Sequence, residues 1–318
     1  MTRPGDREAI SAISPARRLG YRLLGRRFDY VLHTRPAEWP IMAAHTALGY
    51  FLAVGLEGAA RGERLGEGVL GLALWVLGLN AGTLAINSAF DRDEGDIGYL
   101  RSPPPPPPHL AAFGFGLMAA GQLVALVLPP AYALAYGVCF VLSLLYSVPP
   151  FRLKAVAGAD WAINMWGFGT LTPYATWAAT GRPIDTAGAL VLLAFCPLFA
   201  ALYPLTQLYQ FDEDRRRGDR TLALRLGMRR SLVVAVSAVA IAFGLFLAAG
   251  VRAGWGASGA DAPRWAGLAL SLGAWLAVLV PWLARHEGMN PAQHERGMYR
   301  ALGAWAVTDA AVLLAWGA

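Results

Sequence analysis

Long apolar stretches separated by short polar segments run through most of this chain. From residue 39 onward, each stretch is close to the ~20 residues that an α-helix needs to cross the hydrocarbon core of a bilayer. We expect nine such segments, at roughly 39–57, 68–90, 110–128, 131–147, 160–180, 186–209, 231–250, 264–284 and 298–316. Pro129 and Pro130 separate the third from the fourth and predict a hairpin, because proline stops a helix and fixes a turn. The pattern predicts an all-α polytopic membrane protein, a nine-transmembrane-helix bundle.

The first 38 residues have a different pattern. They are polar and rich in arginine, and they lack the apolar core of a cleaved signal peptide. Arginines recur at helical spacing between residues 17 and 27, with leucines and a tyrosine between them. We therefore divide the chain into a cytoplasmic amphipathic segment, residues 1–38, which lies on the inner leaflet, and a membrane domain, residues 39–318.

Composition supports a membrane location. Of the 318 residues, 56% are hydrophobic, and the mean hydropathy of +0.42 is too high for an ordinary soluble domain. The net charge of +6 comes from 27 basic residues, of which Lys154 is the only lysine. These residues lie between apolar segments, so anionic headgroups and phosphates explain them better than a nucleic acid does.

The distribution of basic residues predicts the orientation. With the N-terminus inside, the segments on the inner side hold 22 of the 27 basic residues and the outer segments hold 5. The positive-inside rule then predicts a multi-pass protein of the cell membrane with a cytoplasmic N-terminus and an external C-terminus. The polar ends of the second and sixth segments both fall on the cytoplasmic side.

Those two ends carry the most informative residues of the chain. The first acidic cluster runs from Asn87 to Asp96 and the second from Tyr209 to Thr221. Asn87 and Asp91 are four residues apart and share a helix face, and Gln207, Gln210 and Asp214 form a similar stripe on the sixth segment. Carboxylate and amide oxygens are ligands for Mg²⁺, which keeps coordination positions for substrate phosphates. The alternative is a set of solvated acids at helix ends, but polar groups at a membrane edge are penalised. We therefore predict a metal site for a lipid diphosphate.

A third segment, Tyr146–Lys154, closes the fourth apolar stretch on the same side. Pro149 and Pro150 end the helix and hold Arg152 and Lys154 near the membrane surface. Arginine offers phosphate a fork of donors and lysine a point charge. Simple anchoring by the positive-inside rule remains the alternative.

Together these segments resemble the motifs of the UbiA superfamily of intramembrane prenyltransferases. That family has an Asn-Asp-x-x-Asp-x-x-x-Asp motif, a Tyr-Ser-x-Pro-Pro-x-Arg-x-Lys-like segment and an Asp-x-x-x-Asp-x-x-x-Gly-x-x-Thr motif. The matching residues are Asn87, Asp91, Tyr146 to Lys154, Asp214, Gly218 and Thr221. The chain departs from the pattern at Ser88, Gly95 and Gln210, where the family has aspartates. Asp96 and Asp212 lie nearby, so the coordination is rearranged.

The resemblance implies the role of each residue. The implied Mg²⁺ ligands are Asn87, Asp91, Asp96, Gln210, Asp212 and Asp214. The implied substrate contacts are Tyr146, Ser147, Arg152 and Arg220, and the implied catalytic residues are Asp91, Asp214 and Lys154. Asn164 shares a face with Asp160 at the start of the fifth segment, where both either line an acceptor pocket or are ordinary interfacial residues.

Three functions remain open. The leading one is Mg²⁺-dependent transfer of a prenyl group from an isoprenoid diphosphate to a hydrophobic or aromatic acceptor, within membrane lipids and without nucleic acid. A membrane terpene cyclase of the same fold needs the same ionisation step. A non-catalytic lipid-binding or transport protein is the third, but its polar breaks would lie at the bilayer midplane. We expect His45 and Asp309, the other polar residues within spans, to make helix–helix hydrogen bonds.

Overall fold

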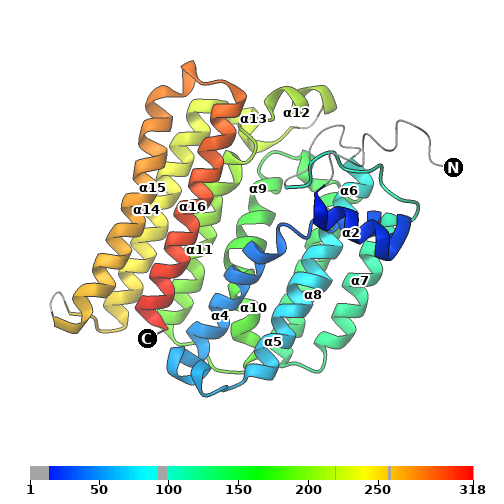
Figure 1. Cartoon of the computed structure of the whole chain (residues 1–318). Coiled ribbons are helices and arrows are strands. Elements are labelled where there is room, and N and C mark those ends of the chain that lie inside the picture. The colour runs from blue at the N-terminus through cyan, green and yellow to red at the C-terminus, as the bar shows by residue number, and fades with distance from the viewer. Residues whose placement is uncertain (1–13, 92–98, 219, 257–258, 318) are drawn as a thin grey trace.

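The computed structural model describes residues 14–91, 99–218, 220–256 and 259–317 as a bundle of helices (Figure 1). Within these ranges the extended pairing is a single isolated bridge between Val156 and Arg220. The all-α architecture predicted from the hydrophobic pattern is confirmed. Asp96 lies outside the described residues.

The helical rods follow the predicted segments closely. In chain order they are α4 (Trp39–Ala60), α5 (Leu65–Ala73) continued by η2 (Leu74–Asn80) and α6 (Ala81–Asp91), α7 (Leu110–Ala125), α8 (Pro130–Ser147), α9 (Ala159–Asn164) continued by η4 (Met165–Leu171) and α10 (Thr172–Ala179), α11 (Thr186–Leu205), α14 (Met228–Arg252), α15 (Ala262–Arg285) and α16 (Pro291–Trp316). Short helices α12 (Phe211–Arg217) and α13 (Leu222–Leu226) join α11 to α14. By length and apolar content, six of the described helices can cross a membrane. The count of nine spans stays a prediction.

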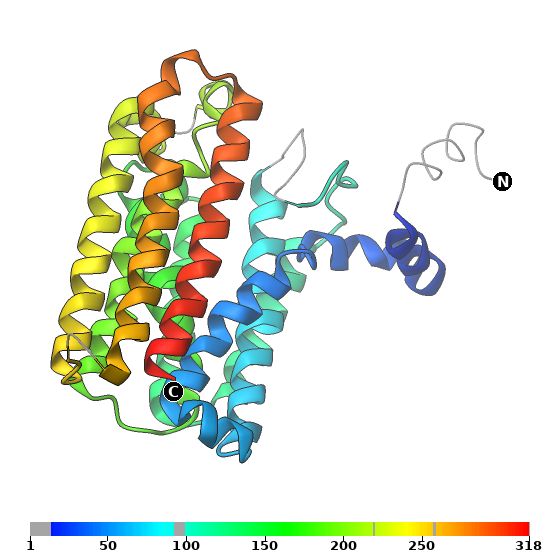
Figure 2. The same ribbon diagram turned by 60° about the vertical axis from the view of Figure 1, so that its left-hand side comes forward.

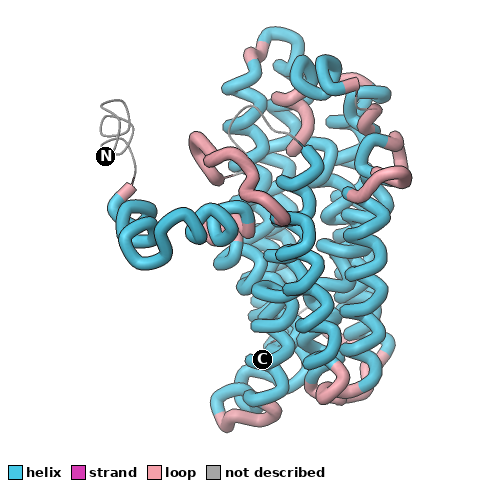
Figure 3. Tube along the Cα trace, turned by 90° about the vertical axis from the view of Figure 1, so that its right-hand side faces the viewer, coloured by secondary structure: helices cyan, strands magenta, loops and turns pink. Residues whose placement is uncertain are grey.

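The N-terminal segment projects from the side of this bundle (Figure 2). It contains α2 (Pro15–Leu24) and α3 (Phe28–His33), and Ser14 caps α2 by accepting a hydrogen bond of 3.3 Å from the amide of Arg17. The Arg17 guanidinium donates to the carbonyls of Arg101 and Ser102, both at 3.0 Å. The segment thereby contacts the proline-rich stretch that leads into α7. The tube view shows the N-terminal helices extending away from the bundle (Figure 3).

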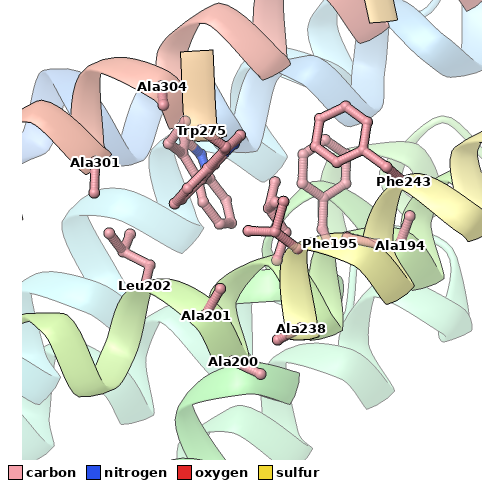
Figure 4. Packing of buried hydrophobic residues seen from close by; sticks show 14 of the residues in the cluster. Ala194, Phe195, Ala200, Ala201, Leu202, Ala238, Phe243, Trp275, Ala301 and Ala304 are labelled. Carbon is pink, nitrogen blue, oxygen red and sulfur yellow. The ribbon is translucent and has the colours of Figure 1, made fainter. Parts of the chain in front are cut away.

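Buried apolar side chains form two clusters inside the bundle. One buried cluster surrounds Phe195 and Trp275 on α11, α14, α15 and α16 (Figure 4). A second surrounds Trp75, Tyr132 and Tyr136 on η2 and α8. Because a bilayer gives little hydrophobic drive between helices, close backbone approach matters more than in water. Gly82 on α6 and Gly114 on α7 show this approach, since a Cβ added to either would meet the other's carbonyl oxygen at 2.6 Å.

Polar side chains inside the bundle are joined across helices. His45 Nδ1 on α4 lies 3.1 Å from the carboxylate of Asp309 on α16, which also accepts a hydrogen bond of 3.1 Å from the Trp305 indole. The other ring nitrogen of His45 lies 3.3 Å from the carbonyl oxygen of Gly169. The helix–helix hydrogen bonds expected for these two residues are confirmed.

Candidate active site

A cavity of about 480 Å³ opens among the helices, lined by residues from the start of α4, from η2 and α6, and from α8, α9, η4, α11 and α16. Polar and charged groups concentrate where α6 ends and α12 begins, while the walls further along η2, η4 and α11 carry Trp75, Phe168 and Phe199. Figure 1 shows the end of α6, the start of α9 and α12 at the same end of the bundle, opposite the C-terminus. The two acidic clusters therefore share one end of the molecule.

The last turns of α6 bring the first cluster to the cavity. Asn87 and Asp91, one helical turn apart, both line it. The Ser147 hydroxyl at the end of α8 donates a hydrogen bond to Asn87 Oδ1. Lys154 forms an ion pair with Asp91, and their side chains are only 11% and 15% exposed. The first acidic cluster and the Tyr146–Lys154 segment, which are separate in the sequence, thus contact each other through this ion pair.

The Tyr146–Lys154 segment divides between the cavity and its surroundings. Tyr146 and Lys154 line the cavity, and the hydroxyl of Tyr146 lies 2.9 Å from that of Tyr203. Arg152 lies outside the cavity lining, in a left-handed conformation (φ 36°) directly before the turn that contains Lys154. Arg152 therefore shapes the turn, and Lys154 is the member of the basic pair that reaches the cavity.

The second cluster is also divided. Gln210, which precedes α12, lines the cavity. Asp214 is buried and accepts a hydrogen bond of 3.4 Å from the Thr221 hydroxyl. The side chain of Asp212 is 78% exposed and pairs with Arg215 at 3.0 Å, and Arg220 is also exposed, so neither lines the cavity. Among the predicted ligands of this cluster, Gln210 alone contributes to the cavity lining.

A buried carboxylate ties the second cluster to α9. Asp160, fully buried, accepts hydrogen bonds from the Gly158 amide at 2.8 Å, the Leu222 amide at 3.1 Å and the Gln207 side chain at 3.4 Å. Asn164, one turn further, lines the cavity and donates to the Asp160 carbonyl at 2.7 Å. Of the two polar residues on this face, Asn164 reaches the cavity and Asp160 holds the loop that follows α12.

A charged pair from the N-terminal segment, which the sequence pattern does not predict, also lines the cavity. Arg35 and Glu38 precede α4, line the cavity and pair at 3.6 Å. Burial raises the pKa of Glu38, and the adjacent Arg35 partly offsets this shift. Arginines in this region are explained equally well by the positive-inside rule, so the residue type alone gave no signal. Tyr203 was also missed because a tyrosine within an apolar helix indicates packing.

The donor set suits a hard cation that shares its coordination with a ligand. The described residues contain no group of three or more His, Cys, Asp or Glu side chains that could hold a metal ion by themselves. Asp91, Asn87 and Gln210 nevertheless offer one carboxylate and two amide groups to the same cavity. Mg²⁺ is commonly bound by one or two carboxylates together with waters and substrate phosphates. These residues therefore fit a Mg²⁺ ion that arrives with a diphosphate.

Comparison with known proteins identifies the family. Residues 43–302 match the sequence profile of the UbiA prenyltransferase family. The chain belongs to this family. The predicted resemblance is confirmed, and with its long apolar helices this UbiA family member is an integral membrane protein. The search of curated proteins gives no match.

Solved structures of the UbiA fold agree with this assignment. A UbiA homologue from Archaeoglobus fulgidus bound to DMAPP and Mg²⁺ superposes with a TM-score of 0.61 at 18% identity, covering 88% of this chain and 98% of that one. The same homologue bound to GPP and Mg²⁺ gives 0.60 at 18% identity, covering 88% and 99%. A digeranylgeranylglyceryl phosphate synthase gives 0.67 at 14% identity, covering 91% and 97%. At these identities the similarity establishes the fold.

Proposed function

We propose that this UbiA family member is a Mg²⁺-dependent prenyltransferase that moves a prenyl group from an isoprenoid diphosphate to a lipophilic acceptor and releases diphosphate. The observation that carries the proposal is the Asp91–Lys154 pair, which lies beside Asn87 and Gln210 in a cavity whose other walls are largely apolar. A diphosphate with a hydrocarbon tail has the same division between charged and apolar parts. The solved UbiA homologue with DMAPP and Mg²⁺ supports the same donor class.

Different residues of the cavity would bind the metal ion, stabilise the leaving group and exclude water. Asn87, Asp91 and Gln210 would hold Mg²⁺, which supplies Lewis-acid neutralisation of diphosphate charge when it is bound. Lys154 would donate to the oxygens of the leaving group as the allylic C–O bond breaks and its electron pair moves to the diphosphate. Phe168 and Phe199, whose rings stack 5.3 Å apart along the cavity wall, would exclude water and face the allylic cation. The acceptor would then bond to C1 and release a proton.

The proposal includes an orientation. All nine helical rods cross the membrane, with the N-terminus and the cavity's charged end on the cytoplasmic side and the C-terminus outside. The support is the 22-to-5 division of basic residues between the two sides. A topology reporter fused after Ala318 is expected to read as external, and one inserted between residues 215 and 225 as cytoplasmic. Finding both reporters on the same side would contradict the nine-span arrangement.

Turnover of a labelled donor tests the reaction. Purified protein is incubated with geranylgeranyl diphosphate, with and without lipophilic acceptors, and diphosphate and prenylated products are measured. Asp91→Ala is expected to lower turnover about a thousandfold or more, since metal-assisted charge stabilisation is worth several kcal/mol. Asp214 lies outside the cavity lining, so Asp214→Ala is expected to lower turnover less, through the packing of α12 beside Gln210. Mg²⁺ is expected to restore activity after chelation and Ca²⁺ to restore it poorly, because Ca²⁺ is larger and favours more ligands.

The outcomes separate the alternatives. Diphosphate release with a cyclised hydrocarbon as the only product would identify a terpene cyclase. Tight donor binding that is indifferent to chelation, with no diphosphate release in any condition, would identify a lipid-binding or transport protein. Both results would refute prenyl transfer.

A further inference from the structure

An unsatisfied amide lies deep in the cavity wall. Asn80, the last residue of the π-helical segment η2, lines the cavity with only 5% of its surface exposed. Its side-chain nitrogen is buried and has no hydrogen-bond partner among the described residues. Inside a bilayer no bulk water takes the place of the missing partner. The free-energy penalty of the unpaired amide N–H group is therefore not reduced by solvent.

Two polar side chains close to Asn80 along the same rod, Trp75 and Thr83, have hydrogen-bond partners, whereas Gln207 Oε1 elsewhere in the lining has none among the described residues. One turn further along, Thr83 Oγ1 lies 2.8 Å from the Leu79 carbonyl and 2.9 Å from Ser143 Oγ. The Trp75 indole donates to Thr172 Oγ1 at 3.2 Å. A buried donor without a partner destabilises the folded protein, and an apolar side chain of the same size would avoid this cost. The contrast with its neighbours indicates that Asn80 meets its partner in a bound molecule.

The backbone gives the depth of this amide. Asn80 and Asn87 both line the cavity and lie seven residues apart on one helical rod, which corresponds to about 10 Å along the axis. Asn80 is therefore well below the charged end of the cavity. Single-turn π-helical insertions are frequent at functional sites, and the cavity has a second one, η4, which contributes Gly167 and Phe168 to the lining.

We propose that Asn80 donates a hydrogen bond to a neutral oxygen, a carbonyl, ether or hydroxyl, on the prenyl acceptor. The inference rests on the proposed prenyl transfer and specifies its second substrate. The isoprenoid diphosphate does not supply this oxygen, because its diphosphate is held at the Asp91 end of the cavity and its tail is a hydrocarbon. A neutral oxygen fits better than an anion, because the cationic residues of the lining, Arg35 and Lys154, each already face a carboxylate. An acceptor that is a hydrocarbon throughout would leave this amide unpaired and would bind more weakly.

Binding of two matched probes tests this assignment without requiring turnover. Menadione and 2-methylnaphthalene share a ring skeleton, and only menadione carries carbonyl oxygens. In equilibrium dialysis with detergent-solubilised protein, Asn80→Leu is expected to weaken menadione about fivefold, the value of a neutral hydrogen bond of about 1 kcal/mol. Binding of 2-methylnaphthalene is expected to stay the same. Leucine has nearly the shape of asparagine, so the melting temperature is expected to hold or rise.

Thr83→Val is the matched control. It removes a polar group from the same wall one turn away, but that hydroxyl is already satisfied within the protein. We expect it to lower the melting temperature and to leave the ratio of menadione to 2-methylnaphthalene affinity unchanged. In turnover assays, Asn80→Leu is expected to raise the KM of an oxygen-bearing acceptor and to leave the KM of geranylgeranyl diphosphate unchanged.

Two results would overturn the inference. The first is menadione binding as tightly to Asn80→Leu as to the native protein. The second is a lower melting temperature for Asn80→Leu, because it would mean that the amide is satisfied within the protein. Failure of the native protein to release diphosphate from geranylgeranyl diphosphate would refute the proposed function instead, while the ratio of probe affinities would still decide the role of Asn80.

Discussion

Lys154 forms an ion pair with Asp91 across the end of the cavity, joining the turn after α8 to the last turn of α6. Neither side chain is more than 15% exposed, so the pair is shielded from the solvent that weakens surface ion pairs. Lys154 is also the only lysine of the chain, among 26 arginines. The ammonium group of Lys154 is compact and is held by an acidic residue of the proposed metal site. It is therefore placed to form an ion pair with an arriving diphosphate.

The first prediction concerns this pair. Lys154→Met is expected to lower kcat about a hundredfold to a thousandfold, the usual effect of removing one donor that stabilises developing negative charge. Lys154→Arg is expected to recover part of the loss, because it keeps the charge and changes the geometry. Steady-state kinetics with geranylgeranyl diphosphate measure both. Arg215→Gln is the control, since Arg215 pairs with the exposed Asp212 away from the cavity. A full-rate Lys154→Met enzyme would contradict the role of Lys154.

The second prediction concerns Asp160 as a positioning residue for the second acidic cluster. Asp160→Asn replaces a carboxylate oxygen that accepts from Leu222 and Gln207 with an amide group that can satisfy fewer of these donors. The loop between α12 and α13 would then be held less firmly. We expect the Mg²⁺ concentration for half-maximal activity to rise about tenfold, the value of one weakened charge-assisted hydrogen bond, with kcat largely restored at saturating Mg²⁺.

A matched carboxylate checks whether this effect is specific. Asp185 caps α11 by accepting a hydrogen bond of 2.7 Å from the Gly188 amide, and it lies outside the cavity lining. Asp185→Asn is expected to lower thermal stability without changing the Mg²⁺ requirement. Equal Mg²⁺ curves for Asp160→Asn and Asp185→Asn would show that Asp160 has only a structural role.

The hydrophobic pattern was sufficient to predict the helical rods, because spanning segments are long and their boundaries are marked by charge and proline. The predicted orientation of these segments also places Asn87, Asp91 and Lys154 at the same end of the molecule. The sequence does not distinguish Asp212 from Asp214, which lie two residues apart on the short helix α12, although Asp212 is exposed and Asp214 is buried. That difference depends on how α12 packs after the chain leaves α11, and the local sequence does not determine this packing.

The sequence pattern also does not predict which residues from distant parts of the chain meet at the cavity. Arg35 and Glu38 reach the cavity because the N-terminal segment turns back into the bundle at the start of α4. The role of Asp160 depends on contacts with Leu222, 62 residues away. Pairings of this kind are fixed by tertiary packing, whereas periodicity reports only which face of a helix a residue occupies.

The third prediction concerns pH and the N-terminal segment. His33 is buried, and its Nε2 lies 3.1 Å from the Pro104 carbonyl, while Nδ1 is buried without a partner in the described part of the chain. Burial lowers the pKa of His33 below its ordinary value of 6.5, although the Pro104 carbonyl acts in the opposite direction. The stability contributed by neutral His33 is therefore present above this value and is lost as the pH falls through 6.5 toward the folded-state pKa.

Hydrogen exchange measures this loss. Amides of α2 and α3 are expected to exchange faster as the pH falls below about 6.5, after correction for intrinsic rates, because protonation releases the segment from the proline-rich connection. His33→Phe removes the titrating group and is expected to abolish the pH dependence. A pH response that persists in His33→Phe would assign the effect to another group.

The last prediction uses Asp309 to separate helix packing from chemistry. The Gly169 carbonyl can only accept, so His45 Nε2 carries a proton and Nδ1 faces the Asp309 carboxylate. In Asp309→Asn, the amide group can still bond to His45 Nδ1, and its oxygen can accept from the Trp305 indole. Every hydrogen bond is kept, so we expect native turnover and a change in stability within about 1 kcal/mol.

Asp309→Leu leaves the Trp305 and His45 groups unpaired and is expected to cost about 1–3 kcal/mol for each. Melting temperatures in detergent and turnover of geranylgeranyl diphosphate distinguish the two variants. Loss of turnover in a stable Asp309→Asn protein would place this buried carboxylate in the reaction and contradict its assignment to packing.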